Sequence, residues 1–266
     1  MVNDMDLLEV ERIRKGLGQS IFSTNIVFHR SLNSTNILAK ELATKGAPEG
    51  TIVVTEEQTK GMGRMGRRWF SPGYVNLLFS LLLYPNIKPD RIFVLTMTLA
   101  LAAIEAIKEM SGLTPMIKWP NDLYVDRRKL AGILAEFSLS RGRIEYVILG
   151  LGLNVNWNPN DEADVTNPAT SILQETGLKL SRNDLLAGIL RLFEDYYRDV
   201  LAGNIDDFYK RWNDLSLIMG QEVEIQSAKE RMRGTALRID KKGALVIKDN
   251  HGKEQKIISG DVSVRF

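Results

Sequence analysis

The chain of 266 residues is long for one compact domain and short for two large ones, so we expect a main domain with a small addition. Its 35 basic and 33 acidic residues leave a formal charge of +2, which argues against bulk binding to nucleic acid or to an anionic membrane. The absence of cysteine excludes disulfides, thiolate metal sites and a cysteine nucleophile. With no signal-peptide pattern in its first residues, the chain is expected to be cytoplasmic.

The segment before the first expected strand has room for one helix. Apolar residues at roughly helical spacing predict a helix over residues 7–17, which Gly18 ends. A strand over residues 25–29 follows. Because so short a segment is too small for a helix-turn-helix domain, we do not expect transcriptional repression by such a module.

A run of three polar residues, Ser34-Thr35-Asn36, precedes an expected helix over residues 37–43. One interpretation is an N-cap, in which a side-chain oxygen accepts a hydrogen bond from an exposed backbone N–H. The other is a site for a neutral polar ligand, because all three side chains can donate and accept hydrogen bonds. The run alone favours the N-cap and leaves the second interpretation open.

A glycine-rich basic loop spans residues 56–76, after an expected strand over residues 51–55. Its Gly61, Gly63 and Gly66 permit close approach of the backbone to a ligand. Its arginines supply fixed positive charge, so the loop suits a carboxylate and a phosphate brought together. A solvated basic turn, including one that touches nucleic acid, is the alternative. The arginines are Arg64, Arg67 and Arg68.

The middle of the chain alternates strands with one buried helix. We expect a strand over residues 76–84 and a helix over residues 89–110, whose apolar part is too short for a membrane span. A strand, a short strand, a tight turn and a further strand are expected over residues 116–137. Pro120 requires a break in this apolar stretch, which places its neighbours at strand ends.

Four polar residues around that break can face a single site across the tight turn: Lys118, Asn121, Asp122 and Lys129. Two ammonium groups suit a polyphosphate, and the carboxylate could hold a metal-bound water or help an incoming amine lose its proton. A surface hairpin with an ordinary ion pair is the alternative. The position of the break inside an apolar pattern argues against that alternative.

A strand over residues 144–149 runs into a further polar end. Gly150 and Gly152 would allow close approach to a ligand, with Asn154 at the end of the strand. Glycines in strands often mark a bulge, so this motif is weak by itself.

The last third of the chain divides into helices and then short strands. Helices over residues 181–201 and 205–215 are expected to act as core and cover, without a titratable cluster. From Gly220 onward, short alternating segments separated by glycine turns predict a small SH3-like β-barrel. We therefore expect one domain over residues 1–219 and the barrel over residues 220–266.

In this order, the motifs closely resemble those of the biotin protein ligases, also called biotin–[acetyl-CoA-carboxylase] ligases. The resemblance covers residues 25–266, and the ordered set is more specific than any single motif. It implies an α+β (mixed α/β) catalytic domain of the class II synthetase-like kind, with a C-terminal SH3-like barrel and without an N-terminal DNA-binding domain. The motifs are Ser34-Thr35-Asn36, Gln58 with GMGRMGRRW, KWPNDLY, KLAGIL, GLGLNV and SGDVSVR.

The resemblance also implies roles for individual residues. The implied biotin and biotinyl-AMP site consists of Ser34, Thr35, Asn36, Gln58, Gly61, Met62, Gly63, Arg64 and Lys129. The implied ATP site consists of Arg64, Arg67, Trp69, Lys118, Asn121, Lys129 and Asn154, and the implied catalytic residues are Lys129, Arg64, Lys118 and Asp122. No residue is assigned as a metal ligand.

Met62 departs from the family pattern, which usually has arginine at this position. A contact made by the backbone N–H of Met62 would survive the change. A contact made by the arginine side chain would not.

The resemblance implies ATP and biotin as substrates, with Mg²⁺. A carboxylate of biotin would attack the α-phosphorus of ATP, and a lysine of a biotin carboxyl carrier protein would then attack biotinyl-5′-AMP. The chain needs no nucleophile of its own for this chemistry, which agrees with the absence of cysteine. The resemblance also favours a homodimer, through a sheet edge or the strand near residues 143–149, and no nucleic-acid or membrane partner.

Two other functions compete with biotin ligation. A lipoate or octanoate ligase or transferase would use the same scaffold, but its ligand would leave the polar Ser-Thr-Asn-Gln group unpaired at about 1–3 kcal/mol per group. A nucleic-acid-binding protein without enzymatic activity could use the basic loop and the barrel. The near-neutral charge argues against that second function.

Overall fold

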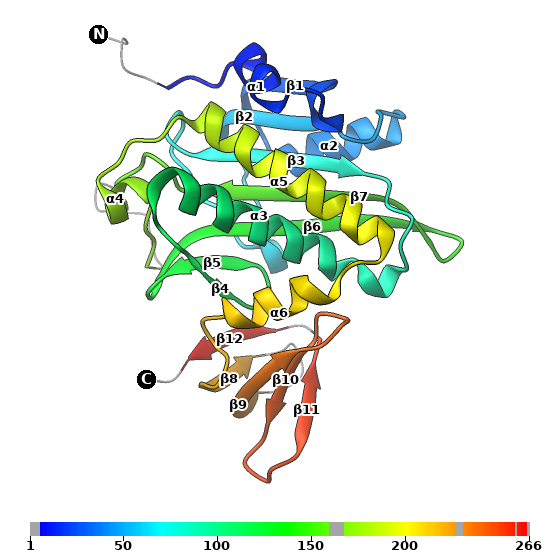
Figure 1. The fold of residues 1–266 in the computed structure, drawn as a ribbon, viewed down its shortest axis with the longest axis vertical. Coiled ribbons are helices and arrows are strands. Elements are labelled where there is room, and N and C mark those ends of the chain that lie inside the picture. Colours follow the sequence, from blue (N-terminus) through cyan, green and yellow to red (C-terminus); the bar gives the residue numbers. More distant parts are fainter. Residues whose placement is uncertain (1–5, 160–167, 227–230, 259, 265–266) are drawn as a thin grey trace.

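The computed structural model describes residues 6–159, 168–226, 231–258 and 260–264. They form a seven-stranded sheet of order β1-β2-β3-β7-β6-β5-β4 and a five-stranded antiparallel sheet of order β11-β10-β9-β8-β12 (Figure 1). The predicted fold class, a mixed α/β unit followed by a small β unit, is confirmed. The predicted division of the chain after residue 219 stays a prediction.

The large sheet is mostly antiparallel. Only its first pair, β1 and β2, is parallel in the described part of the chain, and α2 (Thr35–Thr44) makes the crossover between them. The glycines at 150 and 152 lie within β7, which pairs with β3 on one edge and with β6 on the other. The strands are β1 (Ile26–Leu32), β2 (Ile52–Gln58), β3 (Leu77–Leu83), β4 (Met116–Lys118), β5 (Asp122–Val125), β6 (Arg128–Ser140) and β7 (Arg143–Leu153).

Helices cover both faces of this sheet. Because side chains alternate along a strand, Val53, Leu82 and Ile148 pack with Ala39 of α2 on one face, while Val54, Leu81 and Leu149 belong to the larger core on the other. In Figure 1, α3 and α5 lie across that second face. Besides α2, the longer helices are α1 (Val10–Leu17), α3 (Phe93–Ser111), α5 (Arg182–Ala202) and α6 (Asp206–Asp214).

The long helix α3 is buried on nearly all sides and is mostly apolar, with its charged residues Glu105, Lys108 and Glu109 near its C-terminal end. It ends at Gly112, whose left-handed φ of 76° suits a residue without a Cβ atom. No helix in the described ranges is long and apolar enough to cross a membrane.

The predicted elements agree with the structure, apart from their ends and one omission. The omission is the short helix α4 (Ile172–Thr176), which follows residues 160–167, outside the described part. The strand near residues 143–149 is β7, whose pairing with β3 begins at Val147. The homodimer expected through this strand or a sheet edge stays a prediction.

The five-stranded sheet confirms the short strands expected after Gly220. Its β9–β10 and β10–β11 turns contain Gly243 and Gly252, whose φ angles are 83° and 79°. These left-handed angles explain why glycine stands at both turns. The strands are β8 (Glu222–Gln226), β9 (Arg231–Ile239), β10 (Leu245–Lys248), β11 (Glu254–Ile257) and β12 (Asp261–Val264).

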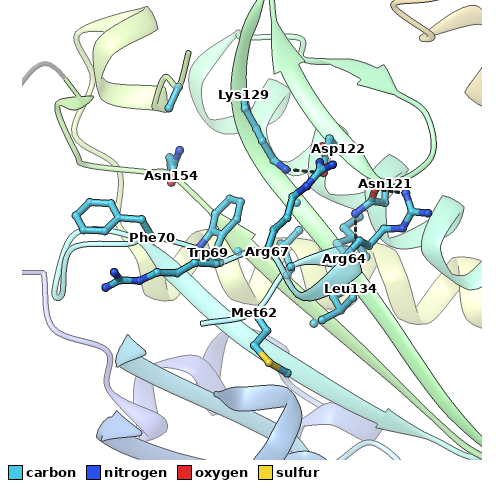
Figure 2. Close-up of a pocket in the computed structure, with 18 of the residues that line it drawn as sticks. Met62, Arg64, Arg67, Trp69, Phe70, Asn121, Asp122, Lys129, Leu134 and Asn154 are labelled. Atoms are coloured by element: carbon cyan, nitrogen blue, oxygen red, sulfur yellow. Dashed lines mark hydrogen bonds and ion pairs between the residues drawn. The ribbon is translucent and has the colours of Figure 1, made fainter. Parts of the chain in front are cut away.

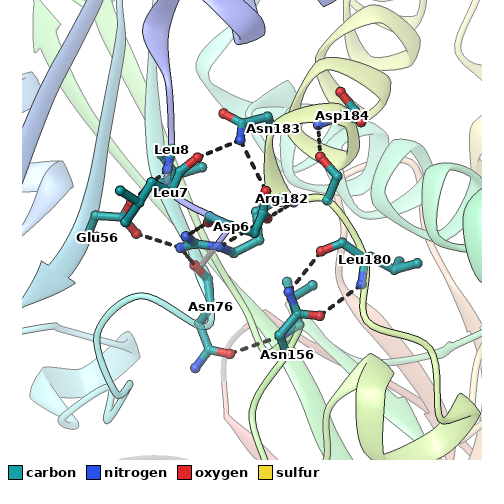
Figure 3. A network of polar contacts seen from close by, with 12 residues as sticks. Asp6, Leu7, Leu8, Glu56, Asn76, Asn156, Leu180, Arg182, Asn183 and Asp184 are labelled. Atoms are coloured by element: carbon teal, nitrogen blue, oxygen red, sulfur yellow. Dashed lines mark hydrogen bonds and ion pairs between the residues drawn. The ribbon is translucent and has the colours of Figure 1, made fainter. Parts of the chain in front are cut away.

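The expectation that the late helices carry no titratable cluster was wrong. Arg182, in the first turn of α5, is fully buried, and its Nη1 donates to Glu56 Oε2 at 2.6 Å and to the Asn76 carbonyl at 3.0 Å (Figure 3). Glu56 Oε1 in turn accepts from the backbone N–H of Leu8 at 2.7 Å. A buried arginine needs such partners because an unpaired charge in the core is costly.

This buried ion pair joins three parts of the chain. Glu56 lies near the end of β2, Asn76 immediately precedes β3, and Asp6 lies before α1, with Arg182 Nε 3.6 Å from Asp6 Oδ2. The two strand ends flank the basic loop, which in the structure runs from residue 59 to residue 76. Arg182 therefore fixes the base of that loop.

We predict that Arg182→Met lowers the free energy of unfolding by about 3–5 kcal/mol, because it leaves Glu56 buried without its cationic partner. Chemical denaturation of the variant and the parent chain measures the loss. Arg12→Met is the matched control, since Arg12 pairs with Asp184 of the same helix at 2.7 Å but both side chains are about half exposed. Equal losses in the two variants would contradict the role given to the buried pair.

Candidate active site

A cavity of about 940 Å³ opens at the ends of β2, β5, β6 and β7, beneath the basic loop (Figure 2). Among its described lining residues, Asp122 is the one carboxylate. Cations are far more numerous, and all of them come from the basic loop, β4 or β6. The lining cations are Arg64, Arg67, Arg68, Lys118 and Lys129.

The structure brings nearly all of the predicted site residues to this one cavity. Gly61 is the exception: it lies one residue before the lining, and its carbonyl accepts from the backbone N–H of Trp69 at 2.9 Å. Their arrangement around the cavity supports one continuous site, while their individual roles stay predictions. The predicted residues that line it are Ser34, Thr35, Asn36, Gln58, Met62, Gly63, Arg64, Arg67, Trp69, Lys118, Asn121, Asp122, Lys129 and Asn154.

The basic loop folds back on itself as a narrow hairpin. Met62 and Arg68 face each other across an isolated antiparallel bridge, and the N–H of Gly63 donates to the Arg67 carbonyl at 2.7 Å. Met65 and Gly66 at the tip have φ angles of 57° and 73°. The N–H of Gly63 is therefore already hydrogen-bonded within the hairpin. Met62 and Arg68 form a non-hydrogen-bonded antiparallel pair, in which the N–H of Met62 points away from the partner strand.

The N-cap interpretation of Ser34-Thr35-Asn36 is right about position, since Ser34 is the N-cap residue of α2, and wrong about the side-chain hydrogen bond. Ser34 has extended backbone and makes no capping hydrogen bond with its side chain. The N–H of Thr35 instead donates to Gln58 Oε1 at 2.7 Å, so a residue of the neighbouring strand satisfies the helix start. Because Gln58 Oε1 accepts from Thr35, the amide N–H₂ group of Gln58 is the part available to donate to a ligand in the cavity.

Two residues that support this polar group were missed by the sequence analysis. Ser80 Oγ lies 2.7 Å from Thr35 Oγ1 and donates to Asn36 Oδ1 at 2.6 Å. Asn36 Nδ2 donates to Glu136 Oε2 at 2.8 Å. The one signal for Ser80 was a hydroxyl inside an otherwise apolar strand, LLFSLLL. The network fixes the orientation of the Asn36 amide.

Gly150 and Gly152 do allow a close approach, but in this structure the groups that approach belong to the protein. A Cβ atom on Gly150 would overlap the Asn36 amide, and one on Gly152 would overlap the Trp69 indole. Glycine is required at both positions because side chains of the site lie directly over β7.

The opposite end of the cavity holds the cations. Lys129 Nζ lies 2.8 Å from Asp122 Oδ1 and 5.4 Å from the centre of the Trp69 ring. Lys118 Nζ lies 4.9 Å from the centre of the Tyr124 ring, a cation–π contact. Figure 2 shows Met62 pointing away from the Lys129–Asp122 pair.

Burial perturbs the titration of these cations. Desolvation is the largest cause that lowers the pKa of Lys118, with the charges of Lys129 and Arg67 acting in the same direction and that of Asp122 opposing them. Desolvation likewise lowers the pKa of Arg64, again against Asp122. The negative charge of Asp122 does not offset the desolvation of either cation. An anion bound in the cavity would supply further negative charge.

The cavity also contains a buried polar atom without a partner. Asn154 donates through Nδ2 to the Thr170 carbonyl at 2.9 Å, while its Oδ1 is buried and has no hydrogen-bond partner in the described structure. Buried polar atoms normally have partners. Asn154 can therefore accept a hydrogen bond from a ligand.

Comparisons with known proteins point to one family. Residues 28–154 match the biotin/lipoate A/B protein ligase family, and residues 218–265 match the biotin protein ligase C-terminal domain. The bifunctional ligase/repressor BirA of Bacillus subtilis is 36% identical over 97% of this chain and 79% of its own length. The biotin–[acetyl-CoA-carboxylase] ligase of Mycobacterium tuberculosis is 28% identical over 93% and 91% of the two chains.

A solved structure agrees with these relatives. The biotin protein ligase from Aquifex aeolicus, determined in complex with biotin and ATP, superposes with a TM-score of 0.77 and 28% sequence identity. The match covers 91% of this chain and 99% of that one.

We predict that the affinity of the cavity for a polyphosphate falls at alkaline pH, at lower pH than the loss of charge of an ordinary lysine would cause, since the lowered pKa of Lys118 makes its ammonium lose its proton earlier. Lys118→Arg should keep its charge and shift the onset of this decline to higher pH. Calorimetric titration with inorganic triphosphate, from neutral pH up to about 10.4, the pKa of an ordinary lysine, measures both curves. Coincident curves would exclude Lys118 as the group responsible.

Proposed function

This chain belongs to the biotin/lipoate A/B protein ligase family, and we propose that it joins biotin to a lysine of a biotin carboxyl carrier protein, with ATP as its second substrate. One observation carries the proposal: a single cavity connects a fixed neutral polar group, Thr35, Asn36 and Gln58, to a cluster of cations. A molecule with an uncharged polar head at one end and a carboxylate near a phosphate at the other fits that arrangement.

The polar end favours biotin over lipoate. Thr35 and Gln58 are held in place by mutual hydrogen bonds and by Ser80, so their remaining donors and acceptors are fixed before a ligand arrives. The ureido ring of biotin has N–H and C=O groups that pair with them. A thiolane or an alkyl chain would leave them unpaired, at about 1–3 kcal/mol each.

The cationic end suits formation of the adenylate. A biotin carboxylate oxygen attacks the α-phosphorus of ATP, a new O–P bond forms, and pyrophosphate leaves. Lys129, Lys118 and Arg64 lower the repulsion between the two anions because their charges are in position before the reaction. We propose that Asn154, through its unpaired Oδ1, and Trp69 hold the adenosine.

Mg²⁺ fits this site as an ion carried mainly by the nucleotide. The described residues contain no group of three His, Cys, Asp or Glu side chains arranged for a metal, and Asp122 is the carboxylate within reach of the phosphates. Mg²⁺ at phosphates commonly uses only one or two protein carboxylates. When bound, it would neutralise phosphate charge, and Asp122 would hold it.

The second step transfers biotin to the acceptor. The lysine amine of the carrier protein attacks the acyl carbon of biotinyl-5′-AMP, a C–N bond forms, and AMP leaves with the bonding electrons. Asp122 is the carboxylate that can take a proton from the incoming ammonium. No enzyme nucleophile is needed.

The reactive intermediate has to be kept from water until the acceptor arrives. The basic loop is the candidate lid, because Arg64 at its tip reaches across the cavity to within 3.4 Å of Asn121 Oδ1. Its base is fixed by Arg182, so closure would involve the tip. We include a homodimer in the proposal because the family resemblance favours one.

Biotin-dependent ATP–pyrophosphate exchange tests the function. Run in parallel with biotin, lipoate and octanoate, it should give exchange with biotin alone, followed by biotin transfer to a carrier protein and release of AMP. Equal exchange with lipoate or octanoate would reassign the substrate, and no exchange with any acid would remove the proposed chemistry.

We predict that Arg64→Ala speeds the release of biotinyl-AMP about 10-fold or more and weakens biotin binding, because a lid contact and a cation are lost together. Single-turnover release of the intermediate is the measurement. Met65→Ala, an exposed change at the same loop tip, should leave the rate unaltered. An unaltered release rate in Arg64→Ala as well would count against the lid.

We predict that Lys129→Ala reduces adenylation about 100-fold or more while the chain stays folded, because a partly exposed cation beside the reacting phosphate is removed. Pyrophosphate release and a thermal melt test both statements. Lys60→Ala serves as the control, because Lys60 is an exposed lysine of the basic loop whose side chain does not line the cavity. Normal pyrophosphate release by Lys129→Ala would take that lysine out of the mechanism.

A further inference from the structure

The turn between β9 and β10 attaches the small sheet to the large unit. In its first half, the N–H of Ile239 donates to Asn213 Oδ1 at 2.9 Å, and the hydroxyl of Tyr209 donates to the Lys241 carbonyl at 2.5 Å. Both partners lie on α6, and Figure 1 shows the five-stranded sheet beneath that helix. We call residues 239–244 the docking turn.

The docking turn also contacts a residue of the cavity lining, Trp119. The indole Nε1 of Trp119 donates to the Gly243 carbonyl at 2.9 Å, and the Trp119 side chain is only 1% exposed. Trp119 follows Lys118 directly and stands two residues before Asn121. The segment from Lys118 to Asp122 lines the cavity throughout, so this hydrogen bond connects the small sheet to the cationic end.

Gly243 is suited to this contact for two separate reasons. Its φ angle of 83° is left-handed, a conformation that costs a residue with a Cβ atom. A Cβ atom there would also overlap the ring of Phe93, at the start of α3. Phe93 cannot yield easily, because its ring packs edge-on against Trp212 with centres 5.4 Å apart.

The small sheet also supplies part of the cavity wall. Gln226 of β8 and Val262 of β12 line it beside the residues of the large unit. A shift of the small sheet would therefore change the wall and the Trp119 contact together.

We propose that the docking turn is a positioning element for the nucleotide end of the site. The Gly243 carbonyl holds Trp119, and Trp119 holds Lys118, Asn121 and Asp122 where they meet the phosphates. The identity of the ligand as ATP rests on the proposed function. The polar group at Thr35 and Gln58 is on other elements, so it should not depend on this contact.

Gly243→Ala tests the proposal, with Gly252→Ala as its matched control. Gly252 sits in the next turn of the same sheet with nearly the same φ angle, 79°, and a Cβ there would meet only Lys248 Cε at 3.8 Å. Both variants thus carry the same backbone strain, but only Gly243→Ala disturbs the contact with the large unit.

In the exchange assay, Gly243→Ala should raise the KM for ATP about 10-fold or more, because small displacements of positioned groups cost large factors in rate and binding. Its KM for biotin should stay within about 2-fold of the parent value by the same reasoning. Gly252→Ala should change neither KM, although both variants lose some thermal stability. Trp119→Phe, which keeps a buried ring and removes the N–H donor, should reproduce the selective rise for ATP.

Relief of the overlap gives a further check. Adding Phe93→Ala, which removes the two nearest atoms, Cγ and Cδ1, to Gly243→Ala should lower the KM for ATP again, whereas adding it to Gly252→Ala should not. If Gly243→Ala does not fold, Trp119→Phe decides the question.

The proposal is overturned if Gly243→Ala and Gly252→Ala have the same KM for ATP, or if the KM values for ATP and biotin rise together. Failure of the proposed function would look different, since the parent chain would then show no biotin-dependent exchange. In that case calorimetric ATP affinities of the parent chain and the two alanine variants still decide whether the turn positions the cationic end.

Discussion

The constraint on which this structure depends is the crowding of positive charge in a half-buried cavity. Arg64, Lys118 and Lys129 converge there with Asp122 as the single described carboxylate of the lining. Burial already lowers the pKa of Arg64 and Lys118, so the arrangement strains the free protein electrostatically. Charge held in place before an anion arrives is the usual means by which an enzyme stabilises a charged transition state. The same crowded cations thus destabilise the free protein electrostatically and would stabilise the charged transition state.

The fold separates the cationic end of the cavity from its neutral polar end, because the two ends are built from different elements. β2 and α2 position Gln58 and Thr35, whereas the basic loop, β4 and β6 position the cations. Between them, β7 contains glycines over which Asn36 and Trp69 can lie. Two tertiary contacts then fix the movable parts: the buried Arg182–Glu56 pair at the base of the basic loop, and the docking turn at Trp119.

Much of this could be predicted from the sequence, because strand alternation, helix ends and glycine turns are local signals. The five motifs Ser34-Thr35-Asn36, Gln58 with GMGRMGRRW, KWPNDLY, KLAGIL and GLGLNV together identified most of the described cavity lining. The failures involve residues whose partners are distant along the chain. Arg182 meets Glu56 across 126 positions and Asn36 meets Glu136 across 100, so neither pairing leaves a local pattern. Ser34 was misread for the same reason: the acceptor at the helix start is Gln58, from a strand that the run itself does not reveal.

The central claim is that the cavity is built for an acyl-adenylate, with one end neutral and the other cationic. Calorimetric binding of a non-hydrolysable analogue of biotinyl-AMP, compared with biotin and with AMP alone, tests it most directly. Each charge-assisted hydrogen bond to the phosphate adds about 1.5–3 kcal/mol, so the analogue should bind about 100-fold tighter than biotin or more. An analogue that binds no tighter than biotin would contradict the account.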